Sequence, residues 1–68
     1  MELYKLIGKK FTKEELESEI ENLGYDILGE FEDYWNVIDI YDDEATETMI
    51  KISDMSNHNG LIKVVDVE

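Results

Sequence analysis

The chain contains no cysteine and no arginine, and only one of its 68 residues is a histidine. Without cysteine, neither a disulfide nor a thiolate-bound metal can reinforce the fold. A single histidine also excludes a zinc site that is built from several imidazoles. Lysine is the only strong base, with six copies, so direct binding to a nucleic-acid backbone, which needs clustered cations, is disfavoured.

Long hydrophobic runs are also missing. No stretch approaches the roughly 20 apolar residues that a transmembrane helix needs. Lysines lie within and after the apolar residues of the N-terminal stretch MELYKLIGKKF, which is not the pattern of a signal peptide. Anionic membrane surfaces repel acidic proteins. We therefore expect a cytoplasmic protein that does not bind membranes.

Acidic residues dominate what is present. Eighteen aspartates and glutamates against six lysines give a net charge of −12. The charge is uneven, because fourteen acids and no base lie between Glu14 and Glu47, whereas residues 1–13 carry four lysines and one glutamate. This acidic section is the strongest functional lead in the sequence, although a charged face can also serve solubility alone.

The length predicts one domain that spans residues 1–68. An apolar fraction of 43% is too high for a disordered chain. A domain of this size buries only about 60% of its unfolded surface, and we expect a net stability on the order of 5 kcal/mol. The protein could be a monomer or a homodimer, since dimerisation would add stability while charge repulsion opposes it.

The clearest local pattern predicts a helix over residues 13–23. Thr12 and Glu15 have the spacing of a capping box, in which each side chain accepts a hydrogen bond from the other residue's backbone N–H. Gly24 can adopt the left-handed conformation that ends a helix. Apolar residues at i, i+4 and i+7 line one face; they are Leu16, Ile20 and Leu23.

Five strands are expected from alternating or β-branched apolar residues. They cover residues 2–7, 25–31, 35–41, 48–53 and 61–67. Within the second strand, Gly29 is a candidate β-bulge. Residues 43–55 also fit a helix, because Ala45, Met49 and Ile52 have helical spacing. Their threonine and isoleucine content favours the strand.

Polar residues at 32–34, 42–47 and 54–60 predict one turn and two loops between consecutive strands. Strands that are joined by short loops pair antiparallel. The expected fold is α+β, in the order β-α-β-β-β-β, with a mainly antiparallel sheet and one amphipathic helix packed on one face. The expected core consists of one face of the first strand and of Leu16, Ile20, Leu23, Ile27, Phe31, Val37, Ile50, Ile52 and Val64.

No constellation of residues indicates an enzyme. Residues 53–58 supply the residue types of a catalytic triad, at Ser53, Asp54, Ser56 and His58. Real triads are assembled from distant parts of a fold and include an oxyanion hole, so turn formation explains this polar loop better. No carboxylate pair stands out as an acid–base couple, and a glycine-rich phosphate loop is missing. We expect a protein without catalytic residues or a cofactor.

Carboxylates also gather in residues 39–47, at Asp39, Asp42, Asp43, Glu44 and Glu47. Calcium takes about six to eight oxygen ligands. The run lacks the ligand spacing and the loop glycine of an EF-hand, so we expect weak cation binding and no dedicated metal site.

Three aromatic residues alternate with acids in residues 30–35. Aromatic anchors with a charged rim are typical of protein interfaces. In the alternative interpretation, Phe31 and Trp35 are ordinary core residues, and Tyr34 is the most exposed of the three.

Carboxylates on a rigid surface can imitate phosphates, since DNA carries one negative charge per about 1.7 Å of its axis. In size, charge and architecture, the chain resembles the small acidic nucleic-acid mimics of phages and mobile elements, such as anti-restriction proteins and inhibitors of DNA-repair or CRISPR enzymes. The resemblance involves no aligned motif, and no functional residue is transferred from it. It implies a protein that occupies the basic groove of a nucleic-acid-binding partner.

The alternative is an acidic adaptor or subunit, which would bind a protein through a sheet edge or an aromatic patch while its charge serves solubility. Both functions need a partner protein, and the first needs one with a basic surface. The candidate partner-binding residues are Glu14, Glu17, Glu21, Glu30, Glu32, Asp33, Tyr34, Trp35, Asp42, Asp43 and Glu44.

The missing ligand spacing yields a first prediction. Thermal melts in excess EDTA and in millimolar calcium should nearly coincide, because no set of oxygen ligands is arranged to gain from the ion. The melts should be followed by circular dichroism at moderate ionic strength. A large rise of the melting temperature in calcium would show that a metal site had been overlooked.

Overall fold

The computed structural model describes residues 2–42, 44–55 and 60–68. The elements along the chain are the 3-10 helix η1 (Glu2–Leu6), strand β1 (Lys10–Phe11), helix α1 (Lys13–Asn22), and the strands β2 (Tyr25–Glu30), β3 (Tyr34–Asp39), β4 (Thr48–Met55) and β5 (Leu61–Val67). The expected α+β class, with one helix on an antiparallel sheet, is confirmed.

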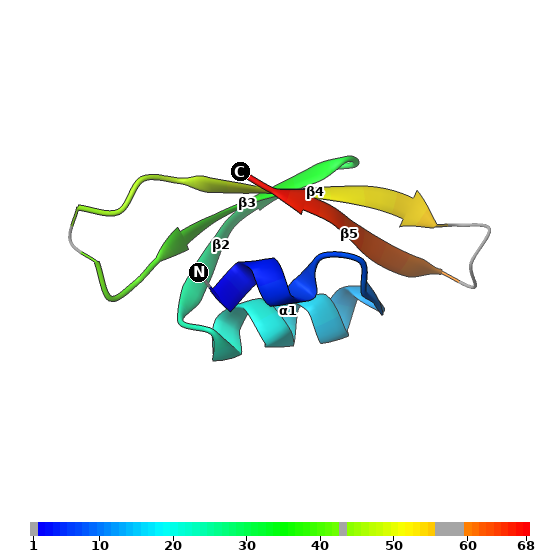
Figure 1. The fold of residues 1–68 in the computed structure, drawn as a ribbon, viewed down its shortest axis with the longest axis horizontal. Coiled ribbons are helices and arrows are strands. Elements are labelled where there is room, and N and C mark those ends of the chain that lie inside the picture. Colours follow the sequence, from blue (N-terminus) through cyan, green and yellow to red (C-terminus); the bar gives the residue numbers. More distant parts are fainter. Residues whose placement is uncertain (1, 43, 56–59) are drawn as a thin grey trace.

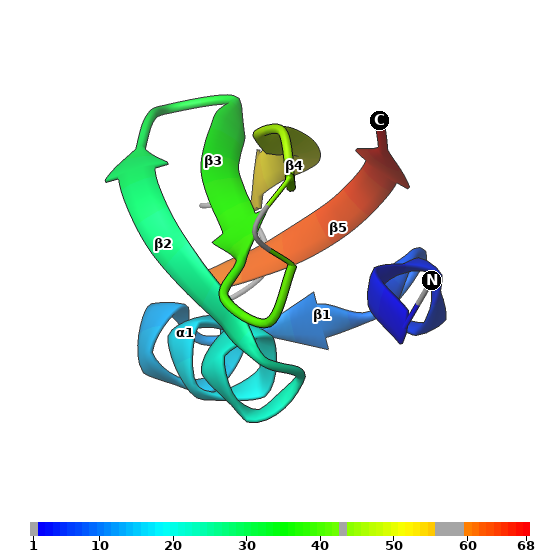
Figure 2. The same cartoon turned by 90° about the vertical axis from the view of Figure 1, so that its left-hand side faces the viewer.

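The five strands form one sheet in the order β1-β5-β4-β3-β2, and all neighbouring strands are antiparallel. The sheet curls, so that its two edge strands, β1 and β2, turn toward the same side (Figures 1 and 2). Helix α1 packs against both of these edge strands and against β5. The helix therefore covers the open side of the curled sheet.

Helix α1 begins and ends as its sequence predicts. The Thr12 N–H donates to Glu15 Oε1 at 2.9 Å, and the Glu15 N–H donates to Thr12 Oγ1 at 3.2 Å. This capping box satisfies two backbone donors that the first turn leaves without an intrahelical partner. Gly24, with φ of 89°, supplies the left-handed residue after the C-cap Leu23.

The predicted strand at residues 2–7 is wrong. Residues 2–6 form η1, and the first strand is the short β1 that follows it. A 3-10 helix has about three residues per turn, which places Leu3 and Leu6 on one side, and both side chains are buried. Gly8, with φ of 86°, then turns the chain, and its N–H donates to Val64 O at 2.8 Å. The burial of Leu3 and Leu6 in the core therefore favours the 3-10 helix over the strand that the alternating pattern predicts.

The other strands lie close to their expected positions. Residues 48–55 are a strand, which decides between the two interpretations of that segment. The β-bulge at Gly29 is confirmed, since the β2–β3 register shifts between Ile27 and Gly29. Strand β3 ends at Asp39, before the predicted end at residue 41. In the predicted loop 54–60, strand β4 continues to Met55, and residues 56–59 lie outside the described part.

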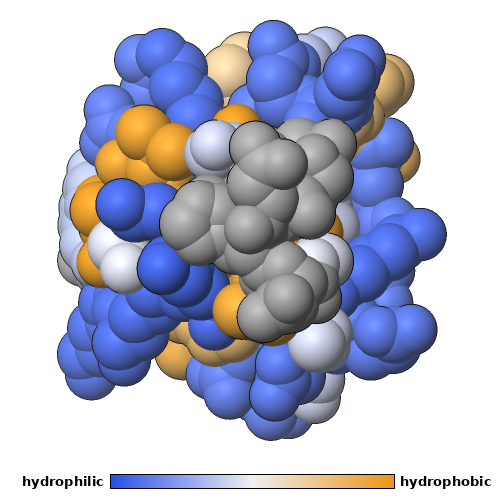
Figure 3. Space-filling view, turned by 90° about the vertical axis from the view of Figure 1, so that its right-hand side faces the viewer, coloured by the Kyte–Doolittle hydropathy of each residue, from blue (hydrophilic) through white to orange (hydrophobic). Residues whose placement is uncertain are grey.

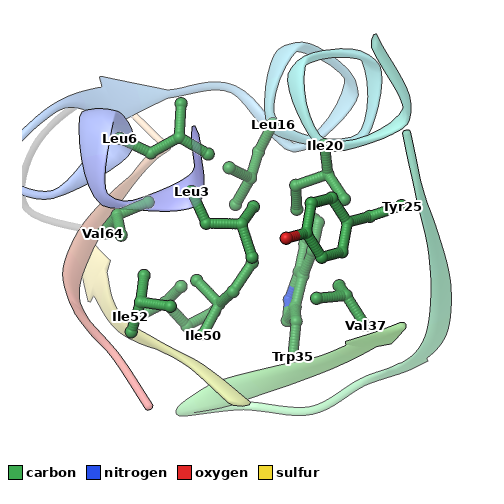
Figure 4. Packing of buried hydrophobic residues seen from close by; sticks show 11 residues of the cluster. Leu3, Leu6, Leu16, Ile20, Tyr25, Trp35, Val37, Ile50, Ile52 and Val64 are labelled. Atoms are coloured by element: carbon green, nitrogen blue, oxygen red, sulfur yellow. The ribbon is translucent and has the colours of Figure 1, made fainter. Parts of the chain in front are cut away.

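The core lies between the sheet, η1 and α1 (Figure 4). Most expected core residues are buried, while Leu23 and Ile27 are partly buried against the core. Phe31 was expected in the core but is 49% exposed, because it lies just beyond the end of β2. Trp35 is only 2% exposed and fills the interior.

Outside the core, hydrophilic residues cover most of the described surface in Figure 3, with smaller apolar areas between them.

The contribution of η1 to the core can be tested with two leucines. Leu3→Ala removes a fully buried side chain and should lower the free energy of unfolding by about 2–5 kcal/mol. Leu28→Ala, at a position that is 51% exposed, should change it by no more than about 0.5 kcal/mol. Urea unfolding followed by circular dichroism measures both. Equal effects of the two substitutions would mean that η1 does not belong to the core.

Candidate functional site

The acids of α1 are oriented by the apolar face of the same helix. Leu16 and Ile20 are fully buried under the sheet, and this fixes the rotation of the helix. Glu14, Glu17 and Glu21, three or four residues apart, then form one row along the helix. Glu14 and Glu21 are exposed and Glu17 is partly exposed. We call this set the helix acids.

The helix acids meet the sheet at Glu30, the last residue of β2. The carboxyl groups of Glu17 and Glu30 share a hydrogen bond. That bond, together with desolvation and the charge of Glu30, raises the pKa of Glu17 above its ordinary value of 4.5, while nearby Lys13 acts in the opposite direction. Glu17, Glu21 and Glu30 also line one groove, so α1 and β2 present one joined acidic surface.

Lys13 is the base nearest to this pair. Its Nζ lies 3.4 Å from Glu30 Oε1. The lysine is largely exposed, and exposed ion pairs contribute little to stability. One lysine does not neutralise the two glutamates and the further acids on the helix, so the surface stays negative at neutral pH.

Between α1 and β2 lies an open groove of about 410 Å³. Glu17 and Glu21 line it from the helix, and residues 27–30 line it from the strand. The β-bulge at Gly29 lies in this wall and leaves Leu28 exposed. The groove is therefore edged by carboxylates with an apolar residue between them.

Beyond Glu30 the chain enters the β2–β3 turn. Glu32 and Asp33 are exposed there and extend the acidic surface past the end of the strand. Phe31 and Tyr34 close the turn, since the Phe31 N–H donates to Tyr34 O at 2.9 Å. Their rings stack, with centroids 4.8 Å apart and planes inclined by 22°.

The aromatic segment thus divides between core and surface. Of the two residues that one interpretation placed in the core, Trp35 is buried and Phe31 is exposed. That interpretation was also wrong in making Tyr34 the most exposed of the three, since Tyr34 is partly buried. The exposed aromatic face beside the acids belongs to Phe31, which was not among the predicted site residues. Its position next to Glu30 and Glu32 gives it a charged rim.

The remaining predicted acids lie in the β3–β4 loop, at the other end of β3 (Figure 1). Asp42 and Glu44 are exposed, and the Glu44 N–H donates to Asp42 Oδ1 at 3.0 Å. Asp43 lies outside the described residues. The Ile40 N–H donates to Gly24 O at 3.0 Å, which brings the C-terminal end of α1 to the base of this loop. The helix acids therefore run from the β2–β3 turn toward the β3–β4 loop.

Lysines mark the opposite edge of the sheet. Lys10 in β1 lies directly across from Lys63 in β5, and β1 is the edge strand farthest from β2 in the strand order. Lys51 pairs with Glu68 at 3.0 Å. Two of the lysines, Lys10 and Lys63, therefore lie together on β1 and β5, whereas the helix acids and Glu30 lie on α1 and β2.

Within residues 2–42, 44–55 and 60–68, no three aspartate or glutamate side chains form a group that could hold a metal ion. The described helices are too short and too polar for any of them to cross a bilayer.

The contact between Glu17 and Glu30 was not predicted, although both residues were named as candidates. The helical repeat predicts which face of α1 is polar, and the strand pattern predicts which face of β2 is polar. Neither pattern predicts how the helix packs on the strand. The signal in the sequence is indirect. Like-charge pairs along α1 weaken an isolated helix, and a helix selected only for stability would carry lysines at some of these positions.

Comparison of the chain with models of protein families, with curated proteins and with solved structures gives no match. What this surface can bind therefore has to be deduced from its chemistry.

The raised pKa of Glu17 yields a pH-dependent prediction. A raised pKa means that the folded protein holds the proton more tightly than the unfolded chain does, so the pair favours folding at low pH and loses this effect as the pH rises through the raised pKa. At pH 7, Glu17→Gln should raise the melting temperature, because it removes the repulsion by Glu30 while its amide can still donate a hydrogen bond to that carboxylate. The gain should shrink below pH 4.5, where Glu17 is protonated in both states.

Glu47→Gln, at an exposed acid of the β3–β4 loop, is the control and should give a smaller gain at pH 7. Melts at several pH values measure both variants. A Glu17→Gln gain that is equal at pH 4 and pH 7, or that matches the control, would show that the two carboxyls do not interact.

Proposed function

We propose that this protein is a non-enzymatic inhibitor that imitates nucleic acid and occupies the basic groove of a nucleic-acid-binding protein. The observation that carries the proposal is the groove that Glu17, Glu21 and Glu30 line together, because it joins the helix acids to the end of β2 and the acids of the β2–β3 turn. Acids that are far apart in the sequence form one rigid negative surface, and such a surface complements a groove that is built to receive phosphates.

The spacing of the charges supports the same proposal. A helix rises about 1.5 Å per residue, so the three helix acids are separated by about 4.5 and 6 Å along its axis. Successive phosphates of one DNA strand are about 3.4 Å apart along the duplex axis. Glu30 adds a carboxylate beside Glu17, although Lys13 offsets part of its charge. The row of carboxylates therefore approaches the charge density of a single strand.

The cost of this arrangement is a further argument for a binding role. Glu17 and Glu30 repel each other when both are ionised, and the last turn of α1 carries no base that would favour the negative end of the helix dipole. A small domain with a stability of about 5 kcal/mol is only marginally stable, so even a small repulsion is a noticeable fraction of its free energy of unfolding. A surface selected only for solubility could alternate acids and lysines, and would stabilise the helix as well.

The adaptor function remains the second candidate. The exposed ring of Phe31, stacked on the partly buried Tyr34, favours it, since aromatic side chains are enriched in protein interfaces. In an adaptor this pair would supply most of the affinity, and the acids would do little beyond solubility. Salt dependence separates the two functions, because salt screens the attraction between exposed charges over distances beyond about 10 Å and does not screen apolar contacts.

The test begins with capture from lysate of the source cells on the immobilised protein, followed by elution with duplex DNA and identification of what is released. Association with the identified partner is then measured from 50 to 200 mM salt. A protein that replaces several phosphates should lose at least about tenfold in affinity over that range. A partner without a basic groove, or binding that salt does not weaken, would contradict the proposal.

A matched pair of variants tests where the charge matters. The double variant Glu14→Lys and Glu21→Lys reverses two exposed helix acids, and the control Glu19→Lys and Glu47→Lys makes the same change in net charge at exposed positions outside the row. The first variant should associate about tenfold more slowly than the control, since steering depends on the field at the binding face. Equal association rates would mean that only total charge counts.

A further inference from the structure

A second hollow lies on the other side of Glu30 from the acidic groove. It has a volume of about 250 Å³. Its apolar lining comes from three strands, with Trp35 from β3, Ile52 from β4 and Ile62 from β5. Lys13, Glu30 and Glu32 stand around it, and Phe31 completes the lining. We call it the Phe31 pocket.

The ring of Phe31 is held in a defined position. One face stacks on Tyr34. Its edge lies over Gly29, where an added Cβ would stand only 2.7 Å from Phe31 Cε2. Because Gly29 has no side chain, the Phe31 ring can pack against its backbone, and the stack on Tyr34 holds one face of the ring. An aromatic ring that is fixed before binding loses little entropy when a partner contacts it.

The rim of the pocket has excess negative charge. Glu30 is shared between Lys13 and Glu17. Glu32 is exposed and has no ion-pair partner in the described part of the chain. A second cation at this rim would therefore meet at least one uncompensated carboxylate.

We propose that the Phe31 pocket receives one arginine side chain from the basic partner, and that this residue anchors the complex. The inference rests on the proposed function and adds to it the chemistry of the central contact. The methylene groups of the arginine lie on the apolar floor. Its guanidinium lies against the ring of Phe31 and donates hydrogen bonds to Glu30 and Glu32.

The pocket fits arginine better than lysine or a small organic ligand. A guanidinium is planar, stacks on aromatic faces and is more weakly hydrated than an ammonium group. Its donors also match carboxylates in a forked geometry. The volume is below the roughly 300–1,000 Å³ of pockets that enclose drug-sized ligands, so a single side chain fills it well.

The experiment uses two probes of equal charge, hexaarginine and hexalysine peptides. Trp35 is the sole tryptophan of the chain and lines the pocket, so its fluorescence and its indole N–H signal report on binding there. At one fixed salt concentration, hexaarginine should bind about fivefold more tightly than hexalysine, because only the guanidinium stacks well on the ring. It should also shift the Trp35 indole signal, which hexalysine leaves nearly unchanged.

Three variants test whether the preference for hexaarginine over hexalysine depends on Phe31. Phe31→Leu keeps an apolar side chain but removes the ring, and should abolish the fivefold preference while hexalysine binds as before. Gly29→Ala should weaken the preference, because the added Cβ would stand 2.7 Å from Phe31 Cε2 and displace the half-exposed ring from its position. Tyr4→Leu, at an aromatic residue of η1 that is 52% exposed, is the control and should retain the full preference.

Equal binding of the two peptides, or a preference that survives Phe31→Leu, would overturn the arginine anchor. Neither result would contradict the proposed function, which is tested by the salt dependence of binding and by the variants of the helix acids. Conversely, a natural partner without a basic groove would contradict the proposed function, even if the peptides showed the preference for arginine. The two proposals can therefore fail independently of each other.

Discussion

The packing of Leu16 and Ile20 into the open side of the curled sheet is the contact on which the rest of the structure depends. Both side chains are fully buried and fix the rotation of α1. Because the helix spans the space between the two edge strands, its position also sets the distance between Glu17 and Glu30. A hydrophobic contact in the core thereby determines the pattern of charge on the surface.

This coupling explains how so small and so acidic a chain can carry a defined surface. The capping box, the core and the β2–β3 register provide stability, and the acids along α1 and β2 oppose it through repulsion. Lys10 and Lys63 lie across from each other on β1 and β5, and of the described ion pairs only the one between Lys13 and Glu30 involves the acidic face. A mimic of phosphates needs charges held in place against their own repulsion, and a rigid two-layer domain supplies that.

Much of the fold follows from local patterns in the sequence. The helix was predicted almost to the residue because its cap and its terminal glycine are local signals, and the Gly29 bulge was predicted for the same reason. The N-terminal segment was not, since Leu3 and Leu6 fit a strand or a 3-10 helix until the core that receives them is known. Phe31 and Trp35 were similarly ambiguous, because burial at the end of a strand depends on where the strand stops. The site acids were named, but their contact depends on packing between distant elements.

The pKa of Glu17 is the most direct measure of whether the two rows of acids form one surface. It can be followed by NMR of the carboxyl carbons in the parent protein and in Glu30→Gln. The account predicts that Glu17 titrates above 4.5 in the parent protein and that its pKa falls when the charge of Glu30 is removed. A Glu17 that titrates at its ordinary value, and is indifferent to Glu30→Gln, would mean that the helix and sheet acids are separate and that no continuous acidic surface exists.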